Sequence, residues 1–425
     1  YGYNDTVINW EDEGKELKEF VVNNPKDPNT THWSRRLFNL DYFFQSGISW
    51  SAVASGKFSC RYVPYGIIPG TGSKTLYGLS DSQYKTIFCL LNSSVASYYL
   101  SAFSPSLNYE AGDIAKIPVI ESIDTSDIDI DRLISIAKED WSRLENTLDF
   151  SRSELLNGQS LLLNAYNQER EKSNEKIQTM MVLEQEINRI FAKEYQLTDD
   201  VSIQVTEKDI RLDCNPFYKY GADKSESELE ALMIADSIKD FISYSVGCMF
   251  GRFSLDKNGF ILANQDCSIE HYLSQVPSPT FMPDEDNVIP IIDFDGDWFE
   301  DDISERFKAF LKISFGDEHF AENLAFIEEG IGKDIKKYFV KDFYADHVKR
   351  YKKRPIYWLF SSPKGSFNAL IYIHRYEPDT ASIILNDYLR EFRRKLDARK
   401  DTNERIEINP STSQKDKTNA IKTIA

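Results

Sequence analysis

Residues 58–68 read FSCRYVPYGII, and this stretch decides how we interpret the first part of the chain. Its short apolar and aromatic run, Phe58–Val63, lies between Gly, Pro and Ser residues, which is typical of a strand that ends in a turn. Similar short runs occur at Thr6–Trp10, Gly66–Ile68 and Ile114–Ile120. One stretch differs, because Tyr84–Leu100 places its apolar residues at helical spacing. We therefore predict a β-rich domain over residues 1–120 with one helical insertion.

Residues 121–195 differ from residues 1–120 in charge and in the spacing of their apolar residues. Charged residues become more frequent, and Ile177, Met180, Ile187 and Phe191 recur at the period of one helix face. The pair Asn157–Gly158 interrupts the pattern. The sequence predicts two long helices here, arranged as an extended spacer or an antiparallel hairpin, and the alternative is an ordinary helical subdomain.

The sequence pattern of residues 196–400 predicts a mixed, mostly helical domain. Ser227–Phe250 and Asp302–Phe315 have amphipathic patterns, and Ile383–Lys400 is a basic helix. Ile356–Phe360 and Ala369–Ile373 are β-branched and aromatic, and the turn residues between them indicate a small β-hairpin. Residues 401–425 are polar, which predicts a flexible tail. The expected class is α+β: a β-rich recognition domain, a long helical spacer and a mostly helical C-terminal domain.

The charge is distributed unevenly along the 425 residues. The formal net charge is −18, which is unfavourable for a protein that binds nucleic acid. Residues 1–120 carry 10 Lys and Arg against 11 Asp and Glu, and residues 346–425 carry 17 against 10. Residues 121–345 therefore hold a net charge of −24. DNA, if it binds, is expected to contact the two ends and avoid the centre.

The overall composition argues against several classes of protein. Five cysteines, odd in number and far apart, argue against disulfides and structural zinc, so reduced cytoplasmic thiols are expected. No apolar run approaches the length of a membrane span. The five histidines show no helical pairing for a metal, and no nucleophile-elbow motif occurs. Because the chain starts at Tyr1 without a leader, we expect it to be part of a larger protein. The cysteines are Cys60, Cys89, Cys214, Cys248 and Cys267.

Two segments of the sequence resemble enzyme motifs but do not match them fully. Gly66–Thr75 resembles a phosphate-binding loop, but Ser73 stands where that loop needs glycine, so a turn-rich loop is the better interpretation. Ile289–Glu300 contains the Asp-x-Asp-Gly of aspartyl-phosphate phosphatases, with Asp293 as nucleophile and Asp295 as acid/base. Such enzymes place Thr or Val where Asp297 stands, and an acidic solvated turn is the alternative.

Basic residues form the most informative sets. The first, interleaved with aromatics, is Lys349, Arg350, Lys352, Lys353 and Arg354, and the second is Arg393, Arg394, Lys395, Arg399 and Lys400. Side chains of this kind contact phosphates and hold a duplex without reading its sequence. The alternative is that these cations neutralise the acidic middle of the same chain.

Polar loops near the N-terminus carry the side chains that read base edges. Arg and Lys can pair with guanine in the major groove, and Gly-rich backbone lets such loops approach closely. The candidates for base or phosphate contacts are Arg35, Arg36, Ser55, Lys57, Arg61 and Lys74.

Longer strings resemble one known family. They include VINWEDEGKELKEF (residues 7–20), LLNSSVASYYLSAFSPSLNYEAGDIAKIPVI (90–120), DEDNVIPIIDFDGDWFEDDI (284–303) and KYFVKDFYADHVKRYKKRPIYWLF (337–360). From Val7 to about Lys400 the chain resembles the C-terminal half of PglX, the adenine-specific DNA methyltransferase of BREX phage-defence systems.

The resemblance implies a role in DNA modification. Members of that family transfer a methyl group from S-adenosylmethionine to N6 of adenine at a short site, which marks host DNA and helps to restrict phage DNA. The region after their methyltransferase domain resembles target-recognition domains. The family's Asn-Pro-Pro-Tyr motif is missing here, since Asn24–Pro25 is followed by Lys26 and Asp27. We therefore expect this segment to select the DNA sequence and to bind the duplex. We expect it to contain no catalytic, cofactor-binding or metal-binding residue and to have no methyltransferase activity alone.

The sequence is compatible with three functions. The first is a module that binds double-stranded DNA. The second is a protein-interaction platform whose acidic middle docks other BREX subunits, while a phage-encoded DNA mimic would compete for the basic surfaces. The third, a free-standing enzyme, has the least support in the sequence.

Overall fold

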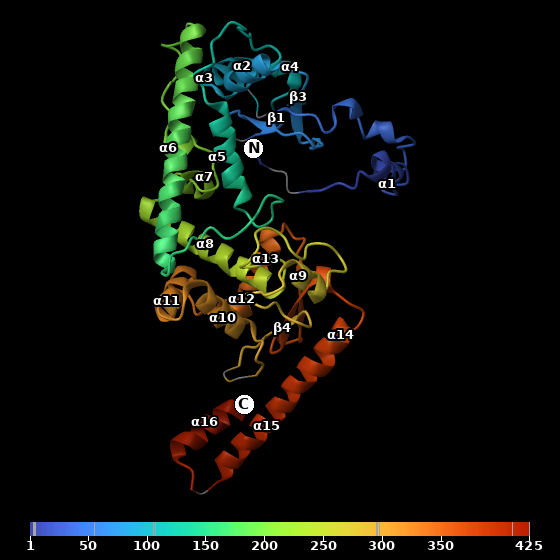
Figure 1. Cartoon of the computed structure of the whole chain (residues 1–425), viewed down its shortest axis with the longest axis vertical. Helices are drawn as coiled ribbons and strands as arrows, with labels where there is room; N and C mark the ends of the chain where they lie inside the picture. Colours follow the sequence, from blue (N-terminus) through green and yellow to red (C-terminus); the bar gives the residue numbers. More distant parts are fainter. Residues whose placement is uncertain are drawn as a thin grey trace. The chain divides into compact units, whose positions relative to one another are not determined.

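A computed structural model describes residues 1–2, 6–54, 56–104, 106, 108–294, 296, 298–409 and 411–424, with side chains to residue 421 (Figure 1). The chain divides into two compact units. Unit 1 comprises Tyr1–Leu148 and Arg170–Leu229, and unit 2 comprises Asp149–Glu169 and Glu230–Ala425. The class is α+β, as the sequence predicts, because each unit combines one small antiparallel sheet with several helices.

The sheet of unit 1 has three antiparallel strands in the order β2–β1–β3. They are β1 (Gly47–Ser51), β2 (Cys60–Val63) and β3 (Ser73–Leu76). The central strand supplies the core residues Ile48 and Trp50, and the Trp50 indole donates a hydrogen bond to the Tyr109 carbonyl at 3.0 Å. The strand predicted within Phe58–Val63 is therefore confirmed as β2.

Three other predicted strands are wrong: Thr6–Trp10, Gly66–Ile68 and Ile114–Ile120 form no strand. In the last of these, the Tyr195 hydroxyl donates to the Pro118 carbonyl at 2.5 Å and accepts from the Ile120 amide at 3.3 Å. A side chain thus satisfies backbone groups that a strand would have paired, while Ile114 and Ile117 still enter the core.

Helices make up most of the rest of unit 1. Tyr84–Leu100, predicted as one helical stretch, is two helices that meet at Ser93, whose hydroxyl donates to the Leu90 carbonyl at 2.7 Å and caps the second helix. Within the described residues, no single helix is long and apolar enough to cross a membrane; α2 and α3 together meet that test but are bent by 69°. The helices are α1 (Glu11–Val22), α2 (Asp81–Asn92), α3 (Ser94–Phe103), α4 (Ala111–Ile114), α5 (Ile130–Ser142), α6 (Leu162–Glu194) and α7 (Pro216–Tyr220).

The two helices predicted from periodicity over residues 121–195 are confirmed as α5 and α6. Asn157–Gly158 lies between the two helices, and Gly158 has a φ of +90°, which glycine adopts without strain. In unit 1, Ile187 and Phe191 of α6 join the core that contains the sheet, as their helical stripe predicts.

Unit 2 is built around α8 (Glu226–Met249) and a second antiparallel sheet in the order β4–β6–β5. The strands are β4 (Val288–Ile291), β5 (Tyr357–Ser361) and β6 (Asn368–Tyr372), so the predicted hairpin is confirmed. Gly247 on α8 allows close packing, because a Cβ there would lie 2.4 Å from a ring carbon of Phe253. The other helices are α9 (Ile269–Gln275), α10 (Ile303–Phe315), α11 (Phe320–Ile331), α12 (Ile335–Lys341) and α13 (Phe343–Arg350).

Helices extend into residues 401–425, for which the sequence predicts a flexible tail. α14 (Thr380–Ile383) leads through one π-helical turn into α15 (Arg390–Ile408), and α16 (Gln414–Ile424) follows. Good helix formers occupy this polar stretch, and the Ser413 hydroxyl accepts from the Asp416 amide at 3.2 Å. Polarity alone therefore does not prevent helix formation, and α15 packs against α16.

Candidate nucleic-acid interface

The most prominent cationic feature is the segment 349–354, which joins α13 to β5 and is called the basic turn below. Four of its side chains are exposed: Lys349, Lys352, Lys353 and Arg354. Arg350 is the exception, since its guanidinium pairs with Asp240 and is mostly buried. Among the described residues, no carboxylate lies within 4 Å of Lys349, Lys353 or Arg354. The idea that this run neutralises the acidic middle therefore holds for Arg350, and it does not hold for Lys349, Lys353 or Arg354.

The backbone of the basic turn is unusual for lysine. Lys352 and Lys353 have φ values of +51° and +65°, in the left-handed region that glycine favours. The Lys353 amide donates to the Val348 carbonyl at 2.8 Å, which is the bond that closes a helix whose last position is left-handed. A left-handed residue other than glycine costs about 1–2 kcal/mol. The turn thus keeps two cationic side chains where the backbone would favour glycine.

His347 fixes the turn between helix and strand. It is 1% exposed, and its Nε2 accepts hydrogen bonds from the Ile356 amide at 3.1 Å and the Tyr357 amide at 3.0 Å. Burial, with the nearby Arg350 and Arg252 guanidinium groups, lowers the pKa of His347 to about 3. A neutral imidazole suits an acceptor of two amides. Sequence reasoning missed this role, because one histidine in a basic run gives no signal of its distant partners.

An apolar hollow of about 280 Å³ lies beside the basic turn. It is lined by Tyr344, Pro355, Trp358, Leu359 and Phe360. Trp358 is 46% exposed, which is unusual for so large an apolar side chain. Cations and exposed aromatic surface therefore occur together at this end of β5.

Arg35 and Arg36, the first predicted contacts in unit 1, lie outside the sheet. Arg35 donates through Nη1 to the Asn29 carbonyl at 3.0 Å, and Arg36 binds Asp27 Oδ2 through Nε and Nη2 at 2.8 and 2.6 Å. Hydrogen bonds from Thr30 and then Arg36 lower the pKa of Asp27. Both arginines are exposed, so these contacts are of the kind that a phosphate can replace at small cost.

The remaining N-terminal candidates are also paired. Lys57 binds Asp209 Oδ1 at 2.6 Å, Arg61 donates to Ser51 Oγ at 2.9 Å, and Lys74 lies 3.2 Å from Glu110 Oε2. Burial opposes ionisation of Asp209, but hydrogen bonds from Lys57 and Thr206 hold the pKa of this carboxyl below its ordinary value. The predicted contact Ser55 lies outside the described residues.

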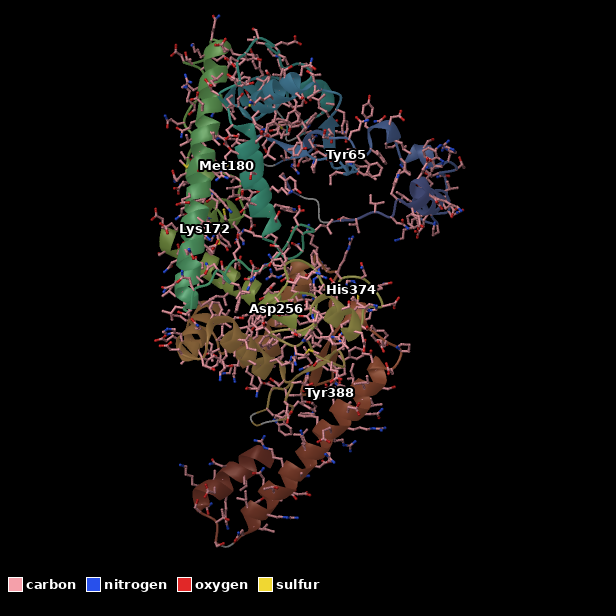
Figure 2. The ribbon with its side chains drawn as sticks, in the orientation of Figure 1. Tyr65, Lys172, Met180, Asp256, His374 and Tyr388 are labelled. Carbon is pink, nitrogen blue, oxygen red and sulfur yellow. The ribbon has the colours of Figure 1, made fainter. Side chains whose placement is uncertain are left out.

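The sheet register separates two of these candidates. Arg61 is opposite Ser49 and Lys74 is opposite Trp50. Because neighbouring residues of a strand point to opposite faces, Arg61 and Lys74 lie on opposite faces of the sheet. The structure therefore does not gather the N-terminal candidates on one surface. The Gly-rich loop between β2 and β3 carries Tyr65, which is 81% exposed and is labelled in Figure 2.

The second basic set, on α15, is partly neutralised. Arg394 binds Glu391 at 2.7 Å, and Lys400 lies 3.7 Å from Glu404. Lys395 donates to the Trp298 carbonyl, and the Arg399 guanidinium lies 5.5 Å from the centre of the Trp298 ring. In the basic turn, by contrast, Lys349, Lys353 and Arg354 have no carboxylate within 4 Å among the described residues.

Comparison with known proteins gives the family. No family model matches the chain. It is 32% identical over 409 residues to the adenine-specific methyltransferase BrxX of Escherichia coli O9:H4 (strain HS), covering 92% of this chain and 32% of that protein. It is also 32% identical over 403 residues to the adenine-specific methyltransferase PglX of Lacticaseibacillus casei (strain Zhang), covering 90% of this chain and 31% of that protein.

The chain is of the PglX/BrxX type. Both matches span nearly all of it at the same level of identity, which confirms the family that its long strings resemble. The PglX/BrxX-type chain spans about a third of the length of these two relatives.

The two enzyme motifs that the sequence only approaches are not supported by the structure of the PglX/BrxX-type chain. Residues 73–76 form a strand where a phosphate-binding loop needs a helix. Asp293 follows β4, an antiparallel strand, and pairs with Lys341 at 3.4 Å. Asp295 and Asp297 lie outside the described residues. Among the described residues, no group of three or more His, Cys, Asp or Glu side chains could hold a metal ion.

Proposed function

We propose that this PglX/BrxX-type chain is the DNA-recognition and DNA-binding portion of a site-specific N6-adenine DNA methyltransferase of phage defence. In that role it would select and grip double-stranded DNA while host DNA is marked and phage DNA is restricted. The two relatives, both adenine-specific methyltransferases by name, support the methyltransferase part of this proposal. The observation that carries the DNA-binding part is the basic turn.

We propose that this chain does not itself perform methyl transfer. S-adenosylmethionine, implied by the family, would need a Gly-rich loop that follows a parallel strand, or comparable residues. Both sheets of the described residues are antiparallel, and the sequence has no Asn-Pro-Pro-Tyr motif. The residues present here do not fit the cofactor. We therefore propose a role in binding, in the bacterial cytoplasm, and no catalytic step for this chain.

The chemistry of the basic turn suits a phosphate backbone. Lys349, Lys353 and Arg354 are exposed, and their charges are not offset by acidic partners within 4 Å among the described residues. Each such cation that meets a phosphate releases condensed counterions, which favours binding at low salt. Because His347 ties the turn to β5, the cations project from an ordered backbone and lose less conformational entropy on binding.

The experiment compares the chain with a triple variant, K349A/K353A/R354A, using fluorescence anisotropy of a labelled 30-base-pair duplex between 50 and 300 mM NaCl. If all three cations contact phosphates, the slope of log affinity against log salt falls in magnitude by about 2.7. Counterion release alone then predicts a loss of affinity of about 100-fold at 0.15 M salt.

A matched control separates this effect from a change in net charge. K312A/K337A/K341A also removes three exposed lysines from unit 2, but each of these is paired with a carboxylate, at 3.5, 3.2 and 3.4 Å. This control should keep the salt slope of the unmodified chain. Equal salt slopes for the unmodified chain and K349A/K353A/R354A would refute the proposed phosphate contacts of the basic turn.

The acidic middle supports a second candidate, a protein-interaction platform that docks other BREX subunits. Its net charge of −24 over residues 121–345 would repel DNA and attract basic partners. A pull-down from cells with and without DNA distinguishes the two roles. Partners retained after nuclease treatment support the platform, and an acidic DNA mimic from phage should compete for the basic turn with duplex DNA.

A further inference from the structure

The outer edge of β5 has unpaired backbone groups. The Ile373 amide donates to the Ile356 carbonyl at 3.0 Å, and the Ser362 amide donates to the Phe367 carbonyl at 2.9 Å. Because an antiparallel strand alternates in direction, Tyr357, Leu359 and Ser361 turn their amides and carbonyls away from β6. His347 accepts from the first of these amides. In the part of the chain that the structure describes, the Leu359 amide and carbonyl have no partner and no strand pairs with this edge.

The apolar hollow lies along the same edge. Trp358, Leu359 and Phe360 of β5 line it together with Tyr344 of α13. His347 of the same helix accepts from the outward-facing Tyr357 amide, so the hollow between α13 and β5 lies on this side of the strand. An unpaired edge beside exposed apolar surface is a template for an added strand.

Positive charge flanks both ends of this edge. Lys349, Lys353 and Arg354 precede β5, and the exposed Lys364 follows it in the hairpin turn. An extended segment laid along β5 would meet cations at each end and apolar side chains in the middle. Charge complementarity therefore favours a segment that carries carboxylates around an apolar residue.

We propose that the outer edge of β5 binds an extended acidic peptide segment of a partner protein by strand addition. The Leu359 amide and carbonyl pair with one residue of the segment, and an apolar side chain next to it fills the hollow. The carboxylates of the segment face the basic turn and Lys364. The spacing of one amide and one carbonyl on Leu359 matches a peptide backbone, whereas a deoxyribose–phosphate chain has no donor for the carbonyl. This inference goes beyond the proposed function, because the backbone pairing involves no DNA, and a peptide and a duplex would compete for the cations of the basic turn.

The first test changes only the ligand. The probe is a fluorescein-labelled ten-residue peptide in which Asp alternates with Val and Ile, titrated against the full chain by anisotropy. N-methylation of alternate amides on one edge of this peptide should weaken binding roughly tenfold, because it removes backbone hydrogen bonds, while methylation of the other edge should have little effect. Equal effects of both methylation patterns, or no saturable binding of the parent peptide, would overturn the proposal.

The second test changes the chain. Leu359→Pro removes the outward amide but leaves the β5–β6 ladder, since proline is tolerated where the amide of an edge strand faces solvent. Leu359→Ala is the matched control, because it shortens the side chain and keeps the amide. We expect L359P to bind the peptide at least tenfold more weakly than L359A, with thermal midpoints that show both to be folded.

Other occupants of the edge give different results. A single-stranded oligonucleotide that displaces the peptide, and whose own affinity falls on Trp358→Ala but not on L359P, would overturn strand addition in favour of base stacking. A molar mass that rises with concentration in the chain but not in L359P would instead show that a second copy occupies the edge, and would also contradict the proposed partner.

Discussion

Lys352 offers a test in which stability and DNA affinity are expected to move in opposite directions. Its φ of +51° closes α13 in the conformation that glycine adopts without strain. Replacing it with glycine removes a cost of about 1–2 kcal/mol and adds about 0.4–1 kcal/mol of chain entropy in the unfolded state. The free energy of unfolding should therefore rise by about 0.5–1 kcal/mol. One phosphate contact is lost, so duplex affinity at 0.15 M salt should fall about fivefold.

Lys352→Ala is the matched control for K352G. Alanine removes the same charge but keeps a Cβ in the left-handed region, so it should lose the same affinity without gaining stability. Urea unfolding followed by circular dichroism gives the stabilities, and anisotropy of the labelled duplex gives the affinities. Equal stability of K352G and K352A would show that the turn is not strained, and unchanged affinity in both would remove Lys352 from the DNA-contacting set.

Three further predictions concern pH, packing and a surface pair. Since the pKa of His347 is lowered from its ordinary 6.5 to about 3, its contribution to stability is present above pH 6.5 and is lost as pH falls toward 3. His347→Gln should reduce the slope of unfolding free energy against pH in that window by up to about 1.4 kcal/mol per unit, and a slope equal to that of the chain would contradict the assigned shift. Gly247→Ala places a Cβ against the buried Phe253 ring and should cost about 1–3 kcal/mol in chemical denaturation, with partial recovery in G247A/F253L. Lys57→Ala removes an exposed pair with Asp209 and should change the thermal stability by less than about 1 kcal/mol; a larger loss would show that this pair holds unit 1 together.

Local sequence patterns predicted the elements whose period is clear. The β-branched runs around residues 356–373 became the β5–β6 hairpin, and the stripe through Ile187 and Phe191 became the buried face of α6. The break at Ser93 was also readable in principle, because a serine hydroxyl that caps a helix start is a local signal. These features depend on residues a few positions apart, which is why periodicity captures them.

The site depends on contacts that periodicity does not contain. Lys57 and Asp209 are 152 positions apart, and Arg350 and Asp240 are 110 apart, so no local pattern distinguishes these cations from their exposed neighbours. Lys352 takes a left-handed conformation at the end of α13, in a position that usually carries glycine. A lysine there gives no local sign of this conformation. Composition could therefore locate the basic turn, but it could not tell which of its side chains are exposed.

Lysine footprinting reports directly whether duplex DNA binds at the basic turn. The chain is acetylated with a water-soluble reagent in the presence and absence of a saturating duplex, and the modified positions are read by mass spectrometry. We expect duplex DNA to protect Lys349, Lys352 and Lys353, while Lys312 and Lys337 react equally in both states. Unchanged reactivity at the first three positions under saturating duplex would contradict it.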